Sequence, residues 1–207
     1  MAYLVFVRHG QSEWNALGLW TGQTDVALSE QGRAEAQKAA EYLQDIPLHK
    51  AYTSKLSRAQ QTLHEIKAAL GTAELETVEH EALNERDYGE FTAKNKWEIK
   101  EQLGDEEFTK LRRNWDHPVP GGETLKDVSN RAVPYFEEHI LADLKAGRNV
   151  IVSAHGNSLR SLMKHLECVA DDKVHEVEIG TGEVLVYEIS DDGTVKGKEL
   201  RAQGGKA

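Results

Sequence analysis

Two copies of one short pattern, His-Gly-(Gln/Asn)-Ser, hold the residues of this sequence whose types and spacing best suit catalysis. The first copy starts at His9, shortly after the apolar residues 3–7, and the second starts at His155, shortly after residues 149–153. Short apolar runs of this kind are typical of strands that are covered on both faces. A lone histidine there is commonly a core residue held by a hydrogen bond, but the matched pair predicts two imidazoles at the ligand-binding edge of one sheet.

Two arginines are expected at the same edge. Arg8 adjoins His9, and Arg58 opens a helix just after a second predicted strand, residues 50–53. Guanidinium groups bind phosphate oxygens through paired hydrogen bonds, so two arginines and two histidines form a cage for one tetrahedral dianion. A neutral imidazole that donates from one nitrogen presents the lone pair of the other to phosphorus, while the second, protonated histidine and the arginines neutralise the transferring group. The cage predicts phosphohistidine chemistry.

A metal site is the main alternative use of paired histidines. The nine histidines show no His-x-x-x-His spacing, and the single cysteine, Cys168, offers no partner for a zinc knuckle. The sequence therefore predicts that no metal takes part.

The composition narrows the range of partners and compartments. The 207 residues carry 25 Lys+Arg against 35 Asp+Glu, a formal net charge of −10, without a long basic run. Nucleic acids and anionic membrane surfaces favour clustered positive charge, so neither is an expected partner. One cysteine suits a reducing compartment, and no stretch approaches about 18 uninterrupted apolar residues, so a soluble, cytoplasmic protein is expected.

Strands and helices alternate along the chain. Helices are expected from Ser29 to before Pro47, from Ser57 to Gly71, from Thr124 through Leu144 with a kink at Pro134, and over residues 158–166. A last strand is expected over residues 184–189. Such alternation predicts an α/β fold in which residues 1–207 form one domain, a three-layer sandwich with a mainly parallel central sheet flanked by helices.

Two segments depart from this alternation. Residues 84–122 are expected to contain charged helices around Trp97 and Trp115, followed by a Pro- and Gly-rich connection, and so to form a helical cap outside the main layers. Residues 192–207 carry several lysines and end in Gly-Gly-Lys-Ala, so they are expected to be a mobile tail.

Several motifs together resemble the cofactor-dependent phosphoglycerate mutases, within the wider histidine phosphatase superfamily. In chain order they are Arg8-His9-Gly10-Gln11-Ser12-Glu13-Trp14-Asn15, Thr21-Gly22, Thr53-Ser54, Arg58-Ala59, Leu83-Asn84-Glu85-Arg86-Asp87-Tyr88-Gly89, Asn95-Lys96, Arg112-Arg113 and Ser153-Ala154-His155-Gly156-Asn157-Ser158-Leu159-Arg160. The resemblance runs from residue 3 to about residue 189. An Arg-His-Gly alone would fit any phosphatase of the superfamily, whereas the first, Glu-Arg-x-Tyr-Gly and last motifs together are specific.

The resemblance implies a role for each matching residue. His9 would be the nucleophile that becomes phosphorylated, His155 with Arg8 and Arg58 would stabilise the transferring group, and Glu85 would be the general acid and base. The substrate-binding set would further include Gly10, Gln11, Ser12, Glu13, Trp14, Asn15, Thr21, Gly22, Arg86, Asp87, Gly156 and Asn157. Tyr88, Lys96, Arg112 and Arg113 would bind the second anionic end of the substrate. The four tryptophans are expected to serve packing rather than to stack on a cofactor.

The implied reaction is the interconversion of 2-phosphoglycerate and 3-phosphoglycerate in glycolysis and gluconeogenesis. Phosphorylated His9 would donate to the free hydroxyl and give bound 2,3-bisphosphoglycerate, which would also be the priming cofactor. Two alternatives stay open: a phosphomonoesterase of the superfamily, in which water replaces the acceptor hydroxyl, and an inactive protein that binds phosphorylated metabolites. A simple phosphatase would not need the set formed by Lys96, Arg112 and Arg113.

Two departures from the family's pattern carry expectations. Ala93 stands where family members usually have glycine, which would alter the loop that presents Lys96 if this position requires φ > 0. Only residues 114–121 separate Arg113 from Gly122, where larger mutases carry a long insertion, so either a monomer or a homodimer is expected.

Overall fold

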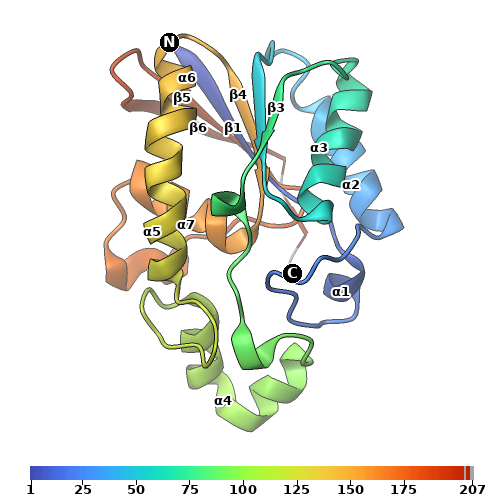
Figure 1. Cartoon of the computed structure of the whole chain (residues 1–207), viewed down its shortest axis with the longest axis vertical. Helices are drawn as coiled ribbons and strands as arrows, with labels where there is room; N and C mark the ends of the chain where they lie inside the picture. The colour runs from blue at the N-terminus through green and yellow to red at the C-terminus, as the bar shows by residue number, and fades with distance from the viewer. Residues whose placement is uncertain (203, 206–207) are drawn as a thin grey trace.

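A six-stranded sheet in the order β3-β2-β4-β1-β5-β6 forms the middle of the molecule (Figure 1). The structure is a computed structural model that describes residues 1–202 and 204–205. The strands are β1 (Ala2–Arg8), β2 (Lys50–Thr53), β3 (Thr77–Glu79), β4 (Val150–Ala154), β5 (Val184–Ile189) and β6 (Val195–Ala202). Strands β3, β2, β4 and β1 pair in parallel, whereas β5 and β6 are antiparallel. The sheet is thus mixed, with the parallel part where the two histidine motifs lie.

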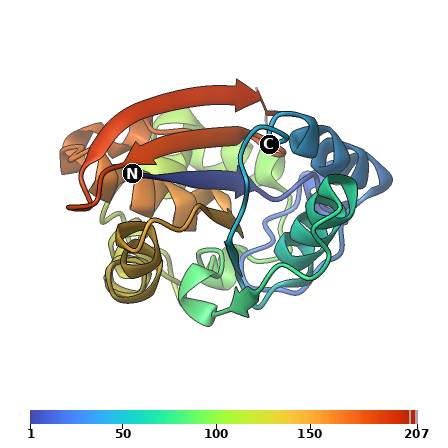
Figure 2. The same ribbon diagram turned by 90° about the horizontal axis from the view of Figure 1, so that it is seen from above.

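Helices cover both faces of this sheet, which confirms the predicted α/β sandwich (Figures 1 and 2). Helices α2 (Glu30–Glu41) and α3 (Ser57–Leu70) pack with Val5, Val7 and Ile151 on one face. The opposite face is covered by α5 (Leu125–Tyr135), α6 (Leu141–Lys145) and α7 (Gly156–Leu166). Alternate strand residues therefore face different cores, as expected of strands that are buried on both sides.

The predicted helix ends are set by local chemistry. Ser29 caps α2 by accepting a hydrogen bond from the Gly32 N–H, and Gly71 ends α3 in the left-handed region at φ 67°. Thr124 and Asp127 form a reciprocal capping box at the start of α5. After Pro134 the helix continues through a π-helical turn, Phe136–Ile140, into α6. The wide turn follows directly on the proline, which lacks an N–H for the regular helical ladder.

The segment 84–122 lies below the sheet in Figure 1 and contains α4 (Lys96–Arg113). A small apolar cluster of Trp20, Ile99, Phe108, Leu111 and Val119 supports it. Trp97 lies on α4, but the helix expected around Trp115 is wrong, because α4 ends at Arg113. Trp115 instead packs against Lys164, whose Nζ lies 4.4 Å from the centroid of the Trp115 ring.

The C-terminal segment differs most from its prediction. Residues 195–202 are strand β6 rather than a mobile tail, so residues 184–189 are not the last strand. The alternation of apolar and polar residues over 195–202 is weak because β6 is an edge strand. Only Ala202 of this strand is buried, and Val195, Gly197 and Arg201 are half-buried. Residues 203, 206 and 207 of the predicted tail lie outside the described residues.

Short elements complete the description. They are α1 (Glu13–Ala16), the 3₁₀ turns η1 (Glu81–Leu83), η2 (Gly89–Phe91) and η4 (Asp171–Glu176), and the π turn η3 (Phe136–Ile140). Across residues 1–202 and 204–205, no helix combines the length and apolar character needed to cross a membrane.

Candidate active site

The pairing of β1 with β4 brings the two histidine motifs together. Arg8 is in register with Ala154, and the His9 N–H donates to the Ala154 carbonyl at 2.9 Å. Neighbouring strands lie about 4.8 Å apart, and the ring centroids of His9 and His155 are 5.0 Å apart. The two imidazoles thus leave adjacent strand ends at the carboxyl edge, where the sequence placed them.

His9 has the protonation state that a nucleophile needs. Its Nδ1 donates to the Gly10 carbonyl at 2.7 Å, so Nε2 carries the lone pair. Burial, followed by the charges of Arg58 and Arg8, holds the pKa of His9 well below its usual value. The ring is therefore neutral at pH 7.

Ser54, a residue without a predicted role, holds the ring of His155. Its Nε2 lies 2.7 Å from Ser54 Oγ, and its buried Nδ1 has no hydrogen-bond partner among the described residues. Burial, followed by the charges of Arg58 and His9, keeps the pKa of His155 well below its usual value. The protonated ring expected from the sequence is therefore wrong for this structure. Ser54 follows β2 directly, and that position at the same sheet edge was the available signal.

Arg8 and Arg58 are fixed by backbone carbonyls. Arg8 Nη1 donates to Ile179 O at 2.9 Å, and its buried Nε has no partner within the described chain. Arg58, which is 1% exposed, donates to Thr24 O at 2.9 Å and to Gly22 O at 2.7 Å. Burial lowers the pKa of Arg58 to about 10, so the guanidinium stays charged at pH 7. Neutral acceptors hold both cations in place without cancelling their charge.

The N-cap of the short helix α1 orients the side chain of Asn15. Ser12 caps α1, and both its N–H and its hydroxyl donate to Asn15 Oδ1, at 3.2 and 2.9 Å. The Asn15 oxygen is thereby occupied, which leaves the amide Nδ2 as the donor that this cleft residue can offer.

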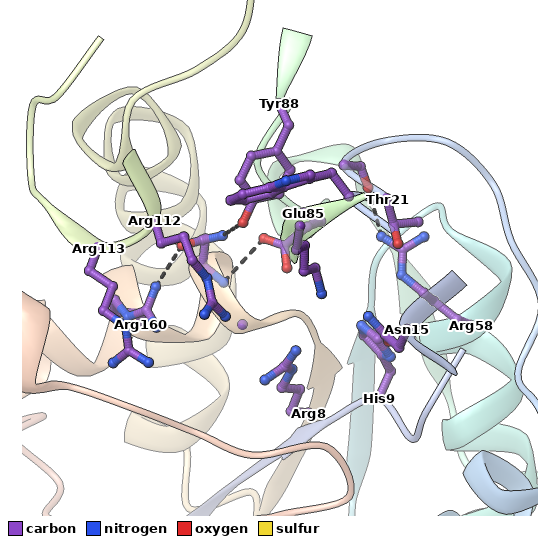
Figure 3. Close-up of a pocket in the computed structure, with 15 residues that line it drawn as sticks. Arg8, His9, Asn15, Thr21, Arg58, Glu85, Tyr88, Arg112, Arg113 and Arg160 are labelled. Atoms are coloured by element: carbon purple, nitrogen blue, oxygen red, sulfur yellow. Dashed lines mark hydrogen bonds between the residues drawn. The ribbon is translucent and has the colours of Figure 1, made fainter. Parts of the chain in front are cut away.

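Glu85 is the only carboxylate that lines the cleft within the described residues. It is 7% exposed, and its Oε1 accepts hydrogen bonds from the N–H groups of Arg86 at 2.8 Å and Asn157 at 3.1 Å. In Figure 3 it lies between His9 and the arginines on the left of the cleft. A carboxylate in this position can exchange protons with a ligand that reaches both sides.

Arg112, Arg113 and Arg160 lie across Glu85 from His9 (Figure 3). Lys96 and Tyr88 also line the cleft and form one group with these three arginines. Burial, followed by the charges of Arg112 and Arg8, lowers the pKa of Lys96 to about 8. Arg113 forms an ion pair with Glu178 and donates to His175 O at 3.4 Å. We call this group the distal end, and His9, His155, Arg8, Arg58 and Asn15 the phosphoryl end.

Most of the predicted site residues meet in this one cleft. The predicted residues that line it are Arg8, His9, Asn15, Thr21, Gly22, Arg58, Glu85, Tyr88, Lys96, Arg112, Arg113, Gly156 and Asn157. His155 is not among the residues that line the cleft, and its ring centroid lies 5.0 Å from that of His9.

Four residues of the predicted substrate-binding set support the first loop instead. Ser12 caps α1, and Glu13 is exposed on that helix. The Gln11 side chain accepts from Ser29 Oγ at 2.9 Å and so turns toward α2. Gly10 packs against the backbone of α2, since a Cβ atom there would lie 2.2 Å from Gly32 O. Glycine is needed here for the close approach of two backbones.

Trp14, Asp87 and Arg86 also lie away from the cleft wall. Asp87 Oδ1 accepts from the Gly89 N–H at 2.8 Å and orders that turn. Arg86 is fully buried, donates from Nη2 to Leu111 O at 2.8 Å, and stacks 4.6 Å from the Tyr88 ring. It ties the C-terminal end of α4 to the Glu85 loop and does not line the cleft, so its contact with substrate stays a prediction.

Trp20 and Arg160 line the cleft without having been assigned to it. Trp20 packs in the cap cluster as expected, and one edge reaches the cleft. Arg160 follows Asn157 by three residues on α7, so both project from one helix face. Six cations were expected in the cleft, and six are present, with Arg160 in place of Arg86.

The loop before Lys96 keeps a glycine-like conformation despite Ala93. Ala93 has φ 66°, and its N–H donates to Trp20 O at 2.9 Å. The Lys96 N–H donates to Gly18 O at 2.9 Å, so the loop is anchored on both sides of the strained residue. Ala93 therefore adopts the left-handed conformation that the sequence analysis considered, at a cost in backbone strain.

The family follows from the arrangement and from one sequence comparison. A model of the histidine phosphatase superfamily (branch 1) matches residues 4–198. The chain belongs to the histidine phosphatase superfamily. This confirms the resemblance noted in the sequence, and the paired histidines and arginines of the phosphoryl end are the residues that carried it.

Within the histidine phosphatase superfamily, the chain is similar to proteins named 2,3-bisphosphoglycerate-dependent phosphoglycerate mutase. It is 46% identical to one from Parvibaculum lavamentivorans, with 95% of both chains covered. It is 45% identical to a second from Gloeobacter violaceus, with 94% of this chain and 89% of that protein covered. These identities extend over the cap as well as the sheet.

Solved structures of similar fold include a mycobacterial glucosyl-3-phosphoglycerate phosphatase in complex with VO₃. It has a TM-score of 0.84 at 24% identity and covers 99% of this chain and 100% of its own. Bacillus stearothermophilus YhfR has a TM-score of 0.79 at 25% identity and covers 100% of this chain and 98% of its own. Among the described residues of this histidine phosphatase superfamily member, no group of three or more His, Cys, Asp or Glu is placed to hold a metal ion.

Proposed function

We propose that this protein interconverts 2-phosphoglycerate and 3-phosphoglycerate through a phosphohistidine enzyme and bound 2,3-bisphosphoglycerate. The observation that carries the proposal is the presence of two cationic ends on either side of one carboxylate. Among the described residues, six cationic side chains and one carboxylate, Glu85, line the cleft. A ligand with two phosphates and a carboxylate carries about five negative charges near neutral pH, which matches this surplus of positive charge.

At the phosphoryl end, His9 Nε2 is the nucleophile. Its lone pair attacks phosphorus, a phosphorus–nitrogen bond forms, and the phosphorus–oxygen bond to the leaving hydroxyl breaks. The Nδ1–H hydrogen bond to Gly10 O persists and stabilises the positive charge that develops on the ring. Arg8 and Arg58 neutralise the transferring oxygens, and they need little reorganisation because carbonyls already hold them.

Glu85 moves the protons of both half-reactions. As the bond to the leaving oxygen breaks, its carboxylic acid donates a proton to that oxygen. In the reverse step its carboxylate accepts the proton of the attacking hydroxyl. The two backbone N–H groups that bind Oε1 fix the carboxylate, so one group can serve either hydroxyl of a ligand that reorients beside it.

The distal end holds the anionic group that is not reacting. Lys96, Arg112 and Arg113 supply charge there, and Arg113 is braced by Glu178. This end supports a mutase over a simple phosphatase, because an intermediate that turns in place must be bound at both ends throughout.

The residues present also fit 2,3-bisphosphoglycerate as a primer. Within the described chain, the buried atoms Arg8 Nε, Thr21 Oγ1 and His155 Nδ1 have no hydrogen-bond partner. Buried polar atoms are normally paired, so these three suit an anion that enters the cleft. When bound, the primer supplies the phosphoryl group that loads His9. Action in the cytoplasm, and a monomeric or dimeric state, stay predictions from the sequence.

The test measures isomerisation and phosphate release in parallel, with and without primer, for the wild type, His9→Ala and the exposed-histidine control His64→Ala. We expect primer-dependent isomerisation that His9→Ala abolishes and His64→Ala retains, with an acid-labile phosphate on His9 by mass measurement. Fast hydrolysis without primer-dependent isomerisation would overturn the mutase proposal in favour of a phosphomonoesterase. Binding of 3-phosphoglycerate without labelling or turnover would identify a binding protein instead.

A further inference from the structure

Arg160 donates hydrogen bonds to two segments of the chain, helix α7 and the backbone at Val177. It is partly buried on α7, and its Nε donates to Val177 O at 2.7 Å. Its Nη1 donates to Asn157 Oδ1, also at 2.7 Å. In Figure 3 it lies beside Arg112 and Arg113, on the side of the cleft away from His9. Burial lowers the pKa of Arg160 to about 10, so it is charged at pH 7.

The direction of the next hydrogen bond follows from the donor inventory. Arginine has donors only, so the atom of Asn157 that faces it must be the amide oxygen. The Asn157 amide cannot flip while this contact lasts, and its Nδ2 therefore faces the other way. That nitrogen donates to the Tyr88 hydroxyl oxygen at 2.9 Å.

The Tyr88 hydroxyl then keeps its own hydrogen for another acceptor. The bond from Asn157 is the only hydrogen bond of this hydroxyl among the described residues. Tyr88 lines the cleft, and its ring is fixed between Arg86 at 4.6 Å and Trp20 at 4.4 Å. The hydroxyl is thus a positioned donor toward the distal end, which suits an anionic acceptor.

We propose that Arg160 is a positioning residue that selects ligands with an anionic group at the distal end. It sets the direction of the chain Arg160–Asn157–Tyr88, so that the Tyr88 hydroxyl donates to the carboxylate or second phosphate of the substrate. The inference rests on the proposed function and deepens it by naming how the distal end distinguishes an anion from a neutral group. Without Arg160, the Asn157 amide is free to flip and the Tyr88 hydroxyl is free to donate to it.

Calorimetric binding to the unphosphorylated enzyme tests this inference without requiring turnover. The ligands are 3-phosphoglycerate and glycerol 3-phosphate, which carries a neutral hydroxymethyl group in place of the carboxylate. We expect Arg160→Gln to weaken 3-phosphoglycerate binding about 10- to 100-fold, the range of a lost charged hydrogen bond, and to change glycerol 3-phosphate binding less than about threefold. The matched control Arg33→Gln removes an exposed α2 arginine that pairs with Glu65, and it should change neither affinity.

The coupling to Tyr88 is tested by a double-mutant cycle. Tyr88→Phe should weaken 3-phosphoglycerate binding about tenfold in the wild type but less than about twofold in Arg160→Gln, because the two residues act in one chain. Additive losses of 3-phosphoglycerate affinity in the double mutant would overturn the inference. Equal losses of affinity for both ligands would overturn it as well, and so would a wild type that does not prefer 3-phosphoglycerate.

A second variant serves if Arg160→Gln unfolds. Arg160→Lys keeps the charge but offers one compact ammonium for two acceptors, so it is expected to give an intermediate loss of the preference for 3-phosphoglycerate.

The two proposals can fail separately. Isomerisation by the wild type is recorded in the same preparation. If the wild type does not isomerise but still prefers the carboxylate in an Arg160-dependent way, the proposed mutase function fails and the inference about Arg160 stands. If the wild type isomerises normally but the losses of affinity are additive, the mutase function stands and the inference about Arg160 fails.

Discussion

The two ends of the cleft hold their cations in different ways. At the phosphoryl end, the guanidinium groups of Arg8 and Arg58 donate to backbone carbonyls, and the His9 backbone is part of the strand pairing. At the distal end, three of the four cations, Lys96, Arg112 and Arg113, belong to α4, which rests on the small cap cluster around Trp20, whereas Arg160 lies on α7. The sheet thus fixes the group that does chemistry, whereas a separate segment presents the group that recognises the rest of the ligand.

The largest expected effect is at the phosphoryl end. Arg58→Gln removes a charge that faces the transferring group, and kcat is expected to fall about 100- to 1000-fold with KM changed only a few-fold. Initial rates of isomerisation measure both constants, with Arg33→Gln as the surface control. A rise in KM with kcat unchanged would show that Arg58 acts in binding alone, and the two ends of the cleft would then not differ in the step that they serve.

At the distal end the effect should fall mainly on binding. Arg113→Gln removes a cation and leaves Glu178 without its ion pair, so KM is expected to rise about 10- to 30-fold with kcat within about threefold. The same rate assay measures this. An equal loss in kcat and kcat/KM would show that Arg113 acts on the transition state instead.

The pH dependence of ligand binding tests the contribution of Lys96 at the distal end. Because the pKa of Lys96 is about 8, its ammonium is charged below that pH and becomes neutral above it. Affinity for 3-phosphoglycerate should therefore fall as the pH rises through 8, by up to about tenfold at one unit above. Lys96→Arg stays charged and should remove this fall, as calorimetry from pH 7 to 9 would record. A fall that persists unchanged in Lys96→Arg would assign the titration to another group.

The smallest effect concerns the strain in the cap loop. Ala93 has φ 66°, so Ala93→Gly relieves a left-handed alanine and is expected to stabilise the protein by about 0.5–1 kcal/mol. Gly71→Ala, at φ 67° with open space around its Cβ position, should destabilise by a similar amount. Denaturant unfolding measures both changes, and destabilisation by Ala93→Gly would contradict the assignment of strain.

Sequence reasoning reached the two histidines and two arginines of the phosphoryl end because each lies at or soon after a strand end. Arg8 ends β1, His9 and His155 follow β1 and β4, and Arg58 lies in the first turn of α3, the helix that follows β2. Apolar runs of strand length and the parallel topology are enough to bring such residues together.

The family resemblance assigned Tyr88, Lys96, Arg112 and Arg113 to the distal end, whereas the places of Arg86 and Arg160 needed tertiary information. Arg86 and Arg160 both belong to recognisable motifs, yet Arg86 turns to the helix-end carbonyl of Leu111, which α4 leaves unsatisfied. Local sequence carries no sign of that acceptor, because Leu111 lies 25 residues away. Arg160 could have been found from its spacing to Asn157 on one helix face. Strand β6 escaped prediction because its Lys- and Gly-containing run pairs at a sheet edge with little burial.

The register of Arg8 with Ala154 also bears on how such an enzyme can evolve. The spacing of His9 and His155 follows from strand pairing, so it survives substitutions in residues 84–122 that change what the cleft admits. A phosphoryl group presents the same oxygens whichever alcohol carries it. New substrate ranges can therefore arise by substitutions in the cap that retain Glu85, while the histidine pair and its spacing are inherited intact.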